Sequence, residues 1–168
     1  QSANIFKMNL RNSIVNISKK KPIKIIQQTN KENISYLRDF YLENGVENKI
    51  FNFENNFENI IKDADLCITR SGASTLAELS VINIPFIAVP LPTSKDNHQL
   101  ENANFYKEND CCWVIEQTNF EKKIEHLLSE ILTDKIDYLK KKENLKKLNY
   151  QNTWINVNQK ILEIINEN

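Results

Sequence analysis

Short apolar runs of strand length alternate along this chain with stretches in which apolar residues recur at helical spacing. Parallel strands need a long crossover between them, so this alternation is typical of a parallel sheet covered by helices on both faces. The runs predict strands at residues 23–28, 49–53, 66–69, 86–89 and 112–115. The last three are mostly apolar, as expected for strands that are buried on both faces. The predicted fold class is therefore α/β.

The helical patterns lie between and after these strands. They predict helices at residues 3–17, 34–42, 76–81, 96–107, 120–132, 135–148 and 154–165. Gly45 follows the second of these helices, at the position where a left-handed residue often ends a helix. The last segment, residues 150–168, can pack back across the sheet or dock on another domain.

Composition limits the functions that are open to the chain. The 168 residues are 40% hydrophobic, and we expect residues 1–168 to form a single packed domain. Lys and Arg balance Asp and Glu at 22 each, which disfavours a nucleic-acid partner. Cys67, Cys111 and Cys112 fit neither a disulfide framework nor a spaced metal site. No apolar stretch is long enough to span a bilayer.

A candidate anion site follows the predicted strand at residues 66–69. A charged residue and a turn of small residues lead from this strand into the next helix: Arg70, Ser71, Gly72 and Ala73. Such a turn exposes backbone N–H groups at the positive end of the helix dipole, and small residues let a phosphate come close. We expect Gly72 to adopt a positive φ, and Ser74 or Thr75 to cap the helix.

Glu78 lies one helical turn beyond Ser74, where its carboxylate can reach the vicinal hydroxyls of a ribose. Each of these features also has a structural explanation. A Ser-Gly turn, a capping hydroxyl and a glutamate favoured by the helix dipole all occur without any ligand.

A second group of polar residues follows the neighbouring strand at residues 86–89, which is bounded by prolines. The helix after it begins with His98, Gln99 and Asn102, whose side chains suit sugar hydroxyls. Ligands of open α/β sheets bind at the carboxyl ends of the strands, so we expect these groups to face the same crevice as Arg70. A His-Gln pair alone indicates only an exposed helix start, but with the preceding motif it favours a ligand site.

Taken together, these motifs resemble the MurG family. Three of them follow that family in order and spacing: Arg70-Ser-Gly-Ala-x-Thr-x-x-Glu78, Pro85-x-x-x-x-Pro90 and His98-Gln-x-x-Asn102-Ala103. MurG transfers N-acetylglucosamine from UDP-N-acetylglucosamine to lipid I, making lipid II for peptidoglycan, on a GT-B fold of two Rossmann-like domains. The resemblance implies that this chain is the C-terminal, donor-binding half of such a glycosyltransferase, with a Rossmann-like parallel sheet flanked by helices.

The same resemblance implies which residues bind the donor. They are Phe53, Glu54, Arg70, Ser71, Gly72, Ala73, Ser74, Thr75, Glu78, His98, Gln99 and Asn102. Phe53 and Glu54 would lie beside the uracil, and Glu78 would hold the ribose hydroxyls. The turn at residues 71–75 would meet the diphosphate, and His98 with Gln99 would bind the N-acetylglucosamine hydroxyls.

The reaction implied by the resemblance is a direct displacement with inversion, in which negative charge builds on the leaving diphosphate. Helix N-termini and Arg70 would stabilise this charge, so we expect neither a metal nor another cofactor. Asp63 and Asp65 precede a strand and so lie away from the site. The general base and the lipid I surface would belong to an N-terminal domain, and no catalytic base is assigned here. The full enzyme would associate peripherally with the cytoplasmic face of the bacterial inner membrane.

Two positions depart from the family pattern. Asn83 replaces the glycine that usually precedes Pro85, and we expect Asn to tolerate a left-handed conformation there. Ser2 stands where a loop of the family usually has glycine. Two other interpretations stay open: a UDP-sugar 2-epimerase or another GT-B relative with a similar donor site, or a stand-alone donor-binding subunit that needs a partner chain.

Overall fold

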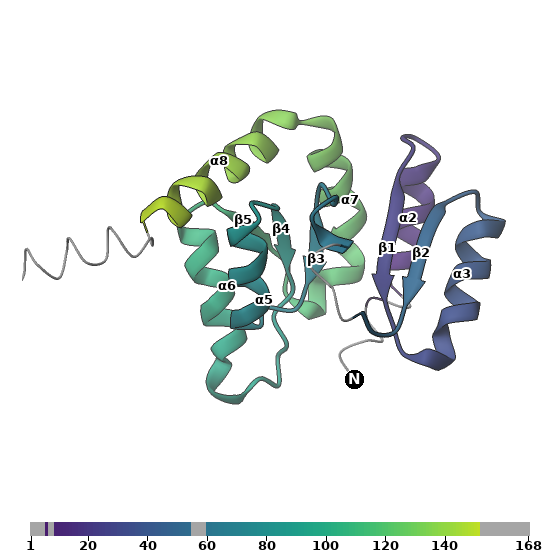
Figure 1. The fold of residues 1–168 in the computed structure, drawn as a ribbon, viewed down its shortest axis with the longest axis horizontal. Helices are drawn as coiled ribbons and strands as arrows, with labels where there is room; N and C mark the ends of the chain where they lie inside the picture. Colours follow the sequence, from purple (N-terminus) through teal and green to yellow (C-terminus); the bar gives the residue numbers. More distant parts are fainter. Residues whose placement is uncertain (1–5, 7–8, 55–59, 152–168) are drawn as a thin grey trace, which may run out of the picture. The chain divides into compact units, whose positions relative to one another are not determined.

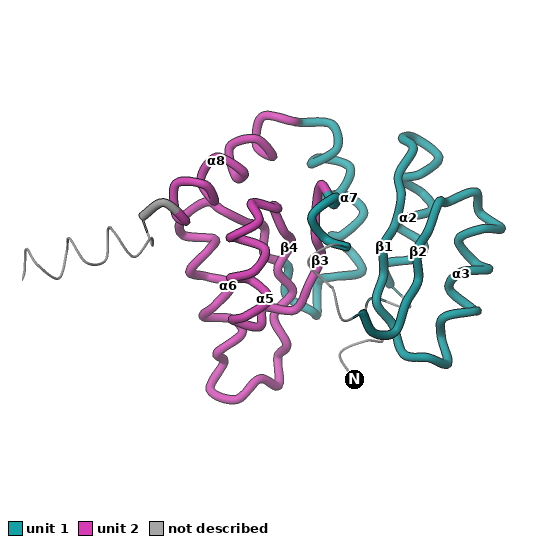
Figure 2. The backbone as a smooth tube through the Cα atoms, in the orientation of Figure 1, with its two compact units in different colours: residues 1–64, 115–134 teal, residues 65–114, 135–168 magenta. Residues whose placement is uncertain are grey.

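The computed structural model of the chain describes residues 6, 9–54 and 60–151 (Figure 1). The chain forms two compact units, of which the first contains residues 1–64 and 115–134 and the second residues 65–114 and 135–168 (Figure 2). Helices alternate with parallel strands, which confirms the predicted α/β class. The single domain expected for residues 1–168 stays a prediction. The helix predicted at 154–165, the start of the helix predicted at 3–17, and Ser2 lie outside the described residues.

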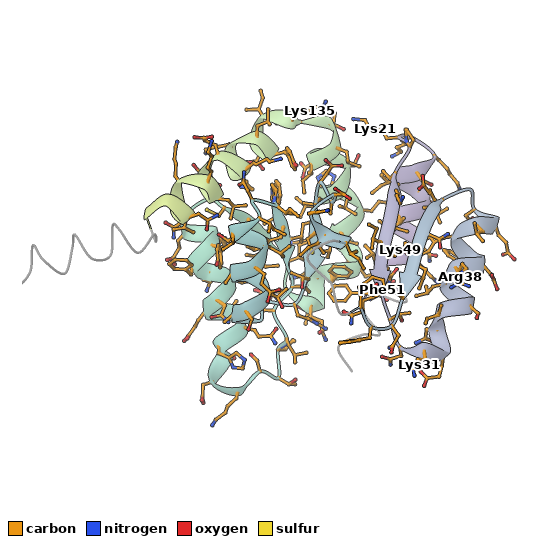
Figure 3. The ribbon with its side chains drawn as sticks, in the orientation of Figure 1. Lys21, Lys31, Arg38, Lys49, Phe51 and Lys135 are labelled. Carbon is orange, nitrogen blue, oxygen red and sulfur yellow. The ribbon has the colours of Figure 1, made fainter. Side chains whose placement is uncertain are left out.

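The first unit contains a two-stranded parallel sheet. Its elements are α2 (Leu10–Ser18), β1 (Lys24–Gln28), η1 (Lys31–Asn33), α3 (Ile34–Glu43), β2 (Glu47–Phe51), η3 (Gln117–Asn119) and α7 (Phe120–Thr133). β1 and β2 are paired from Lys24 opposite Glu47 to Gln28 opposite Phe51. Figure 3 labels Lys49 and Phe51 of β2, and Lys21 at the turn between α2 and β1, whose ammonium donates to the Leu132 carbonyl.

The helices of this unit are held by apolar packing and by polar contacts. α2 packs on α7, and the ring of Phe6 meets the ring of Phe120 edge-on with centroids 5.7 Å apart. On α3, Tyr41 is fully buried and donates its hydroxyl to Gln27 Oε1 at 2.9 Å, and burial raises the pKa of this phenol. The Arg11 guanidinium lies 4.9 Å from the centroid of the Phe40 ring, in a cation–π contact between α2 and α3.

The second unit contains a three-stranded parallel sheet in the order β3-β4-β5. Its elements are β3 (Cys67–Thr69), α5 (Ala73–Val81), β4 (Phe86–Ala88), η2 (Lys95–Asn97), α6 (His98–Glu108), β5 (Cys112–Val114) and α8 (Lys135–Gln151). All three residues of the central strand β4 are 0% exposed, as expected for a strand that is covered on both faces. Within residues 9–54 and 60–151, no helix has both the length and the apolar character that a bilayer span requires.

Five strands lie close to their predicted ranges, and β2 differs most. It begins at Glu47, whereas residues 47 and 48 read as a polar loop and the strand was expected at 49–53. The reason is that β2 is only partly covered, so polar residues fit its exposed positions. Its first residue is also tied to β1, because Lys24 Nζ lies 2.7 Å from Glu47 Oε1.

Three helices end with the same backbone turn. α3, α5 and α6 are followed by residues with positive φ, which are Gly45 (70°), Asn83 (59°) and Asp110 (52°). In each case the next N–H donates to a carbonyl five residues earlier, from Val46 to Tyr41, from Ile84 to Leu79 and from Cys111 to Tyr106. This is the Schellman motif. The expectations for Gly45 and Asn83 are confirmed.

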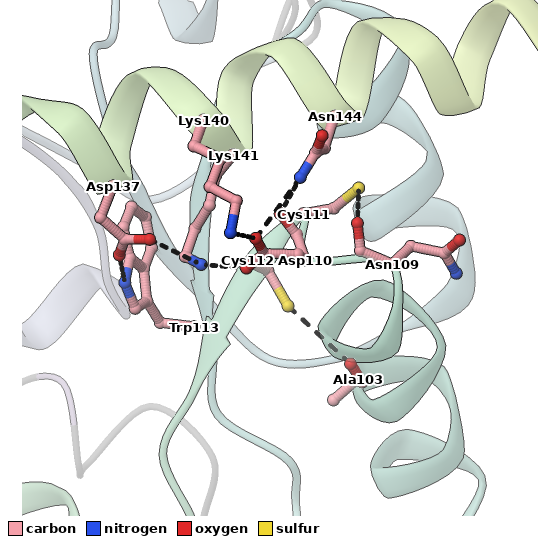
Figure 4. A network of polar contacts seen from close by, with 10 residues as sticks. All are labelled: Ala103, Asn109, Asp110, Cys111, Cys112, Trp113, Asp137, Lys140, Lys141 and Asn144. Carbon is pink, nitrogen blue, oxygen red and sulfur yellow. Dashed lines mark hydrogen bonds and ion pairs between the residues drawn. The ribbon is translucent and has the colours of Figure 1, made fainter.

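A polar network ties α8 to the rest of the second unit (Figure 4). Lys141 is 7% exposed at its side chain and lies 2.7 Å from Asp110 Oδ1 and 3.2 Å from Asp137 Oδ1. Its ammonium also lies 5.0 Å from the centroid of the Trp113 ring, whose Nε1 donates to Asp137 Oδ2 at 2.8 Å. Hydrogen bonds from Lys140 and Lys141 lower the pKa of the Asp110 carboxyl. The buried ammonium is thus surrounded by two carboxylates and an aromatic face.

We predict that Asp110→Asn lowers the free energy of unfolding at pH 7 by about 1–2 kcal/mol, because the buried ammonium loses a carboxylate while the shape is kept. The folded pKa of Asp110 is depressed, so its contribution is present above the ordinary value of 3.8 and is lost as the pH falls through the folded value. Urea unfolding at pH 7 and pH 3 should therefore show a difference between wild type and variant that shrinks at the lower pH. Glu143→Gln, in the exposed pair with Lys147, is the control and should change little; an equal effect would contradict the role of burial.

The positive φ of Asn83 gives a second prediction. Asn83→Ala should lower the free energy of unfolding by about 1 kcal/mol, because a left-handed conformation costs an ordinary L-residue roughly 1–2 kcal/mol. Asn83→Gly should be neutral or stabilising, since Asn83 Oδ1 is buried with no hydrogen-bond partner among the described residues. Urea denaturation of both variants measures the difference, and equal destabilisation by Ala and Gly would argue against backbone strain.

Candidate functional site

The carboxyl ends of β3 and β4 lie next to each other. Thr69 is paired with Ala88 at the ends of the two strands, and the Val89 N–H donates to the Thr69 carbonyl at 2.8 Å. Arg70 follows β3 directly, and its Nη1 donates to the carbonyls of Val89 at 3.2 Å and Pro90 at 3.4 Å. Partial burial lowers the pKa of this guanidinium, which stays charged at neutral pH. The predicted edge of the sheet therefore carries a fixed positive charge. The same guanidinium links the residues that follow β3 to those that follow β4.

The turn after Arg70 starts α5 in a different way from the one expected. Gly72 is the N-cap residue with φ −66° and ψ 135°, so the expected positive φ is wrong. The N-cap has no side-chain hydrogen bond, so the expected capping by Ser74 or Thr75 is also wrong. The helix begins at Ala73, earlier than a Ser74 or Thr75 cap would allow, and this places both hydroxyl residues inside its first turn.

This first turn has the geometry of an anion site. The N–H groups of Ala73, Ser74 and Thr75 precede the first intrahelical bond, which runs from the Leu76 N–H to the Gly72 carbonyl at 3.0 Å. Ala73 and Ser74 are exposed. Backbone donors at the positive end of a nine-residue helix attract negative charge, and Arg70 lies two residues before the N-cap.

Ser71 and Glu78 differ in their exposure to solvent. Ser71 is 0% exposed, and its carbonyl accepts a hydrogen bond from Asn102 Nδ2 at 3.0 Å. Its hydroxyl has no hydrogen-bond partner among the residues that the structure describes. Glu78 is exposed on α5, four residues after Ser74 and therefore on the same helix face. The glutamate side chain is thus available to a ligand, whereas the serine can offer mainly its backbone.

The second predicted motif lies at the start of α6, after β4. Asp96 and Asn97 have φ of 49° and 54°, so the continuous helix begins at His98 and not at residue 96 as expected. Asp and Asn accept the left-handed region more readily than most residues, which allows this sharp entry. His98 is exposed, and its Nδ1 contacts the Lys95 carbonyl. Because a carbonyl only accepts, Nδ1 carries the proton, and Nε2 of the neutral ring is an acceptor.

Gln99 connects α6 to the exit of β4. Its Oε1 accepts a hydrogen bond from the Leu91 N–H at 3.0 Å. The amide nitrogen of Gln99 takes no part in this bond, and it can donate to a ligand. Sequence reasoning did not single out Leu91 or the carbonyls of Val89 and Pro90. The prolines at 85, 90 and 92 were the available signal, since they mark a rigid exit whose backbone groups need partners from side chains.

Phe53 and Glu54 belong to the first unit and follow β2. Phe53 is 74% exposed, and Glu54 is partly exposed. Beside them, the ends of β1 and β2 are joined by hydrogen bonds from the Thr29 N–H to the Phe51 carbonyl at 2.8 Å and from Asn52 Nδ2 to the Thr29 carbonyl at 2.9 Å. An exposed aromatic ring directly after an ordered strand end is a suitable surface for a planar base.

The remaining reactive side chains do not suggest another chemistry. Burial raises the pKa of Cys112 to about 12 and that of Cys111 to about 11, so both thiols stay protonated and unreactive at neutral pH. Asp63 and Asp65 precede β3, at the end of the strand away from Arg70. In the described part of the chain, no three His, Cys, Asp or Glu side chains are grouped closely enough to hold a metal ion.

Comparison with known proteins connects this chain to a family. A model of the glycosyltransferase family 28 C-terminal domain matches residues 1–154. The chain is 44% identical over its whole length to the UDP-N-acetylglucosamine–N-acetylmuramyl-(pentapeptide) pyrophosphoryl-undecaprenol N-acetylglucosamine transferase of Pelagibacter ubique, of which it covers 48%. The protein of the same name from Rickettsia canadensis is 38% identical over 71% of the chain, which covers 34% of that relative. The chain thus spans about half the length, or less, of these relatives.

A solved structure shows the same fold. The crystal structure of Acinetobacter baumannii MurG matches 86% of this chain with a TM-score of 0.75 at 20% identity, and the match covers 42% of that protein. The Rossmann-like fold and the resemblance to MurG are thereby confirmed. Since the family match extends over residues 1–154, the chain belongs to the glycosyltransferase family 28 C-terminal domain family.

Proposed function

We propose that this chain binds the UDP-N-acetylglucosamine donor of an inverting N-acetylglucosaminyltransferase that converts lipid I to lipid II in peptidoglycan synthesis. The observation that carries the proposal is the first turn of α5, whose backbone donors begin three residues after Arg70 at the carboxyl edge of the sheet. The names of the relatives support the choice of UDP-N-acetylglucosamine.

Each part of the donor has a proposed partner. The diphosphate binds at residues 71–75, and the exposed Glu78 carboxylate accepts hydrogen bonds from both ribose hydroxyls. The uracil lies against Phe53 and the backbone of Glu54. His98 accepts from a hydroxyl of the N-acetylglucosamine through Nε2, and Gln99 donates to another through its amide nitrogen. Asn102 completes the donor-binding set through the contact that it makes with Ser71.

In this proposal the chain assists the leaving group. As the acceptor hydroxyl attacks the anomeric carbon, negative charge grows on the diphosphate. The α5 amides and Arg70 interact with this charge, so they stabilise the transition state more strongly than the ground state. We assign the general base and the lipid I surface to the part of the protein outside this chain. We also propose that the whole enzyme associates peripherally with the cytoplasmic face of the bacterial inner membrane, where lipid I is available.

The role of Glu78 gives a direct prediction. Glu78→Ala should weaken UDP-N-acetylglucosamine binding by about 10- to 100-fold, since hydrogen bonds to a charged group contribute roughly 1.5–3 kcal/mol. Isothermal titration calorimetry of wild type and variant measures the change. Glu108→Ala is the control and should bind as wild type does, because Glu108 is an exposed glutamate at the C-terminal end of α6, whereas the proposed sugar contacts lie at its N-terminal end. Equal affinities of the Glu78 variant and the wild type would remove Glu78 from the ribose site.

The burial of Ser71 gives a second prediction. Ser71→Ala should leave UDP affinity unchanged within about twofold, because the hydroxyl is buried and only the backbone of residue 71 faces its partners. Ser74→Ala should lower UDP affinity by about 2- to 10-fold, since Ser74 is exposed in the first turn and a neutral hydrogen bond contributes roughly 0.5–1.5 kcal/mol. Calorimetry with UDP compares the two variants. A large loss in the Ser71 variant would mean that its hydroxyl reaches the diphosphate.

A further inference from the structure

The end of β2 determines where Phe53 and Glu54 lie, because these two residues follow the strand closely in the chain. Phe53 is 74% exposed, so packing does not hold its ring in place. Glu54 is partly exposed and lies outside any helix or strand. The direction in which the chain leaves the sheet therefore sets the position of this pair.

The pairing of β1 with β2 continues one step beyond the last strand residues. Gln28 is opposite Phe51 at the ends of the strands, and the Thr29 N–H donates to the Phe51 carbonyl at 2.8 Å. In a parallel ladder, a residue donates to one residue of the partner strand and accepts from the residue two positions further along that strand. Continued pairing would therefore bring the Phe53 N–H to the Thr29 carbonyl.

The side chain of Asn52 takes the place of that backbone donor. Its Nδ2 donates to the Thr29 carbonyl at 2.9 Å, and Thr29 itself is buried, with only 5% of its surface exposed. A side-chain amide that satisfies the last carbonyl of a buried strand end makes the next backbone donor unnecessary there. The chain can therefore leave the sheet after Asn52 while the Thr29 carbonyl keeps its partner.

Gln28 fixes the peptide group that follows Asn52. Its Nε2 donates to the Asn52 carbonyl at 3.0 Å. Because the peptide group is planar and trans, this bond directs the Phe53 N–H to the side opposite Gln28. Asn52 is thus held through its side chain by Thr29 and through its carbonyl by Gln28. We call these two hydrogen bonds the β2 clasp.

We propose that the β2 clasp sets the preference of the base site for uracil over cytosine, with Asn52 and Gln28 as positioning residues. This inference rests on the proposed function, which places the uracil against Phe53 and the backbone of Glu54. Uracil offers a donor at N3 and an acceptor at O4, whereas cytosine offers an acceptor at N3 and a donor at N4. Backbone N–H and C=O groups held in fixed directions match one of these patterns and leave the other with unpaired polar groups.

The test compares UDP with CDP, which share the ribose and the diphosphate and differ only in the base. By calorimetry, Asn52→Ala should weaken UDP binding by about tenfold and CDP binding by at most about threefold, because a loosened strand end no longer holds its backbone for one base. Gln28→Ala should lower the ratio of the UDP and CDP affinities in the same direction. Gln28 is exposed, so this second variant does not disturb the packed core.

Asn48→Ala is the matched control. Asn48 also lies on β2 and donates from Nδ2 to a backbone carbonyl, that of Val46 at 3.1 Å, but at the amino end of the strand. The control should leave both affinities unchanged. Asn52→Asp keeps the shape of the side chain but cannot donate when ionised, so it should lower the affinity ratio as the alanine variant does.

The two clasp residues separate positioning from direct contact. If Asn52→Ala lowers the affinity ratio and Gln28→Ala does not, Asn52 contacts the base itself and the inference is wrong. An unchanged ratio in both variants, or an equal loss of UDP and CDP binding, would also overturn the inference and leave the proposed function intact. A wild-type chain that does not bind UDP, or that binds CDP equally tightly, would instead overturn the base site of the proposed function.

Discussion

The parallel pairing of β3 with β4 is the constraint on which the candidate site depends. The two strands are in register at Thr69 and Ala88, so the chain leaves both at the same edge of the sheet. β4 is 0% exposed on every residue, and a slip of one position would exchange the side chains that pack on each of its faces. The packed core therefore determines where the strand exits begin. The polar groups of the candidate site in this unit come after these strand ends in the chain, and the register of the strands therefore sets where they start. They are the Arg70 guanidinium and the first turns of α5 and α6.

Several polar side chains at this edge bind the backbone of neighbouring loops. Arg70 donates to carbonyls after β4, Gln99 accepts from the Leu91 N–H, and Asn102 donates to the Ser71 carbonyl. Loops at a strand edge leave backbone groups without sheet partners, and these side chains satisfy them. Residue type alone indicates that the edge needs donors and acceptors. It does not separate the groups that a ligand uses from those that hold the loops, and that distinction requires the contacts themselves.

The element types and the parallel topology could be predicted from the sequence, because apolar runs and helical spacing report burial directly. Details that depend on long-range pairing could not. Pairing with β1 extends β2 to Glu47, and nothing local marks this. Gly72 was expected at positive φ because glycine permits it, but the structure places it in an extended conformation. Positive φ occurs instead at Asp96 and Asn97, where the entry into α6 bends sharply. A glycine in the sequence therefore shows that a positive φ is allowed at that position, and not that the backbone adopts it.

The three Schellman turns have a consequence for how the sequence of this fold can drift. Each needs a residue that accepts the left-handed region, and the chain uses Gly45, Asn83 and Asp110 in these equivalent roles. Substitution at such a position is free within this small group of amino acids and strongly restricted outside it. A lineage under pressure toward Asn-rich composition can therefore replace glycine at helix ends without altering the path of the backbone, and this chain contains only two glycines in 168 residues. Loss of glycine from a motif is, at these turns, no sign that the fold has been lost.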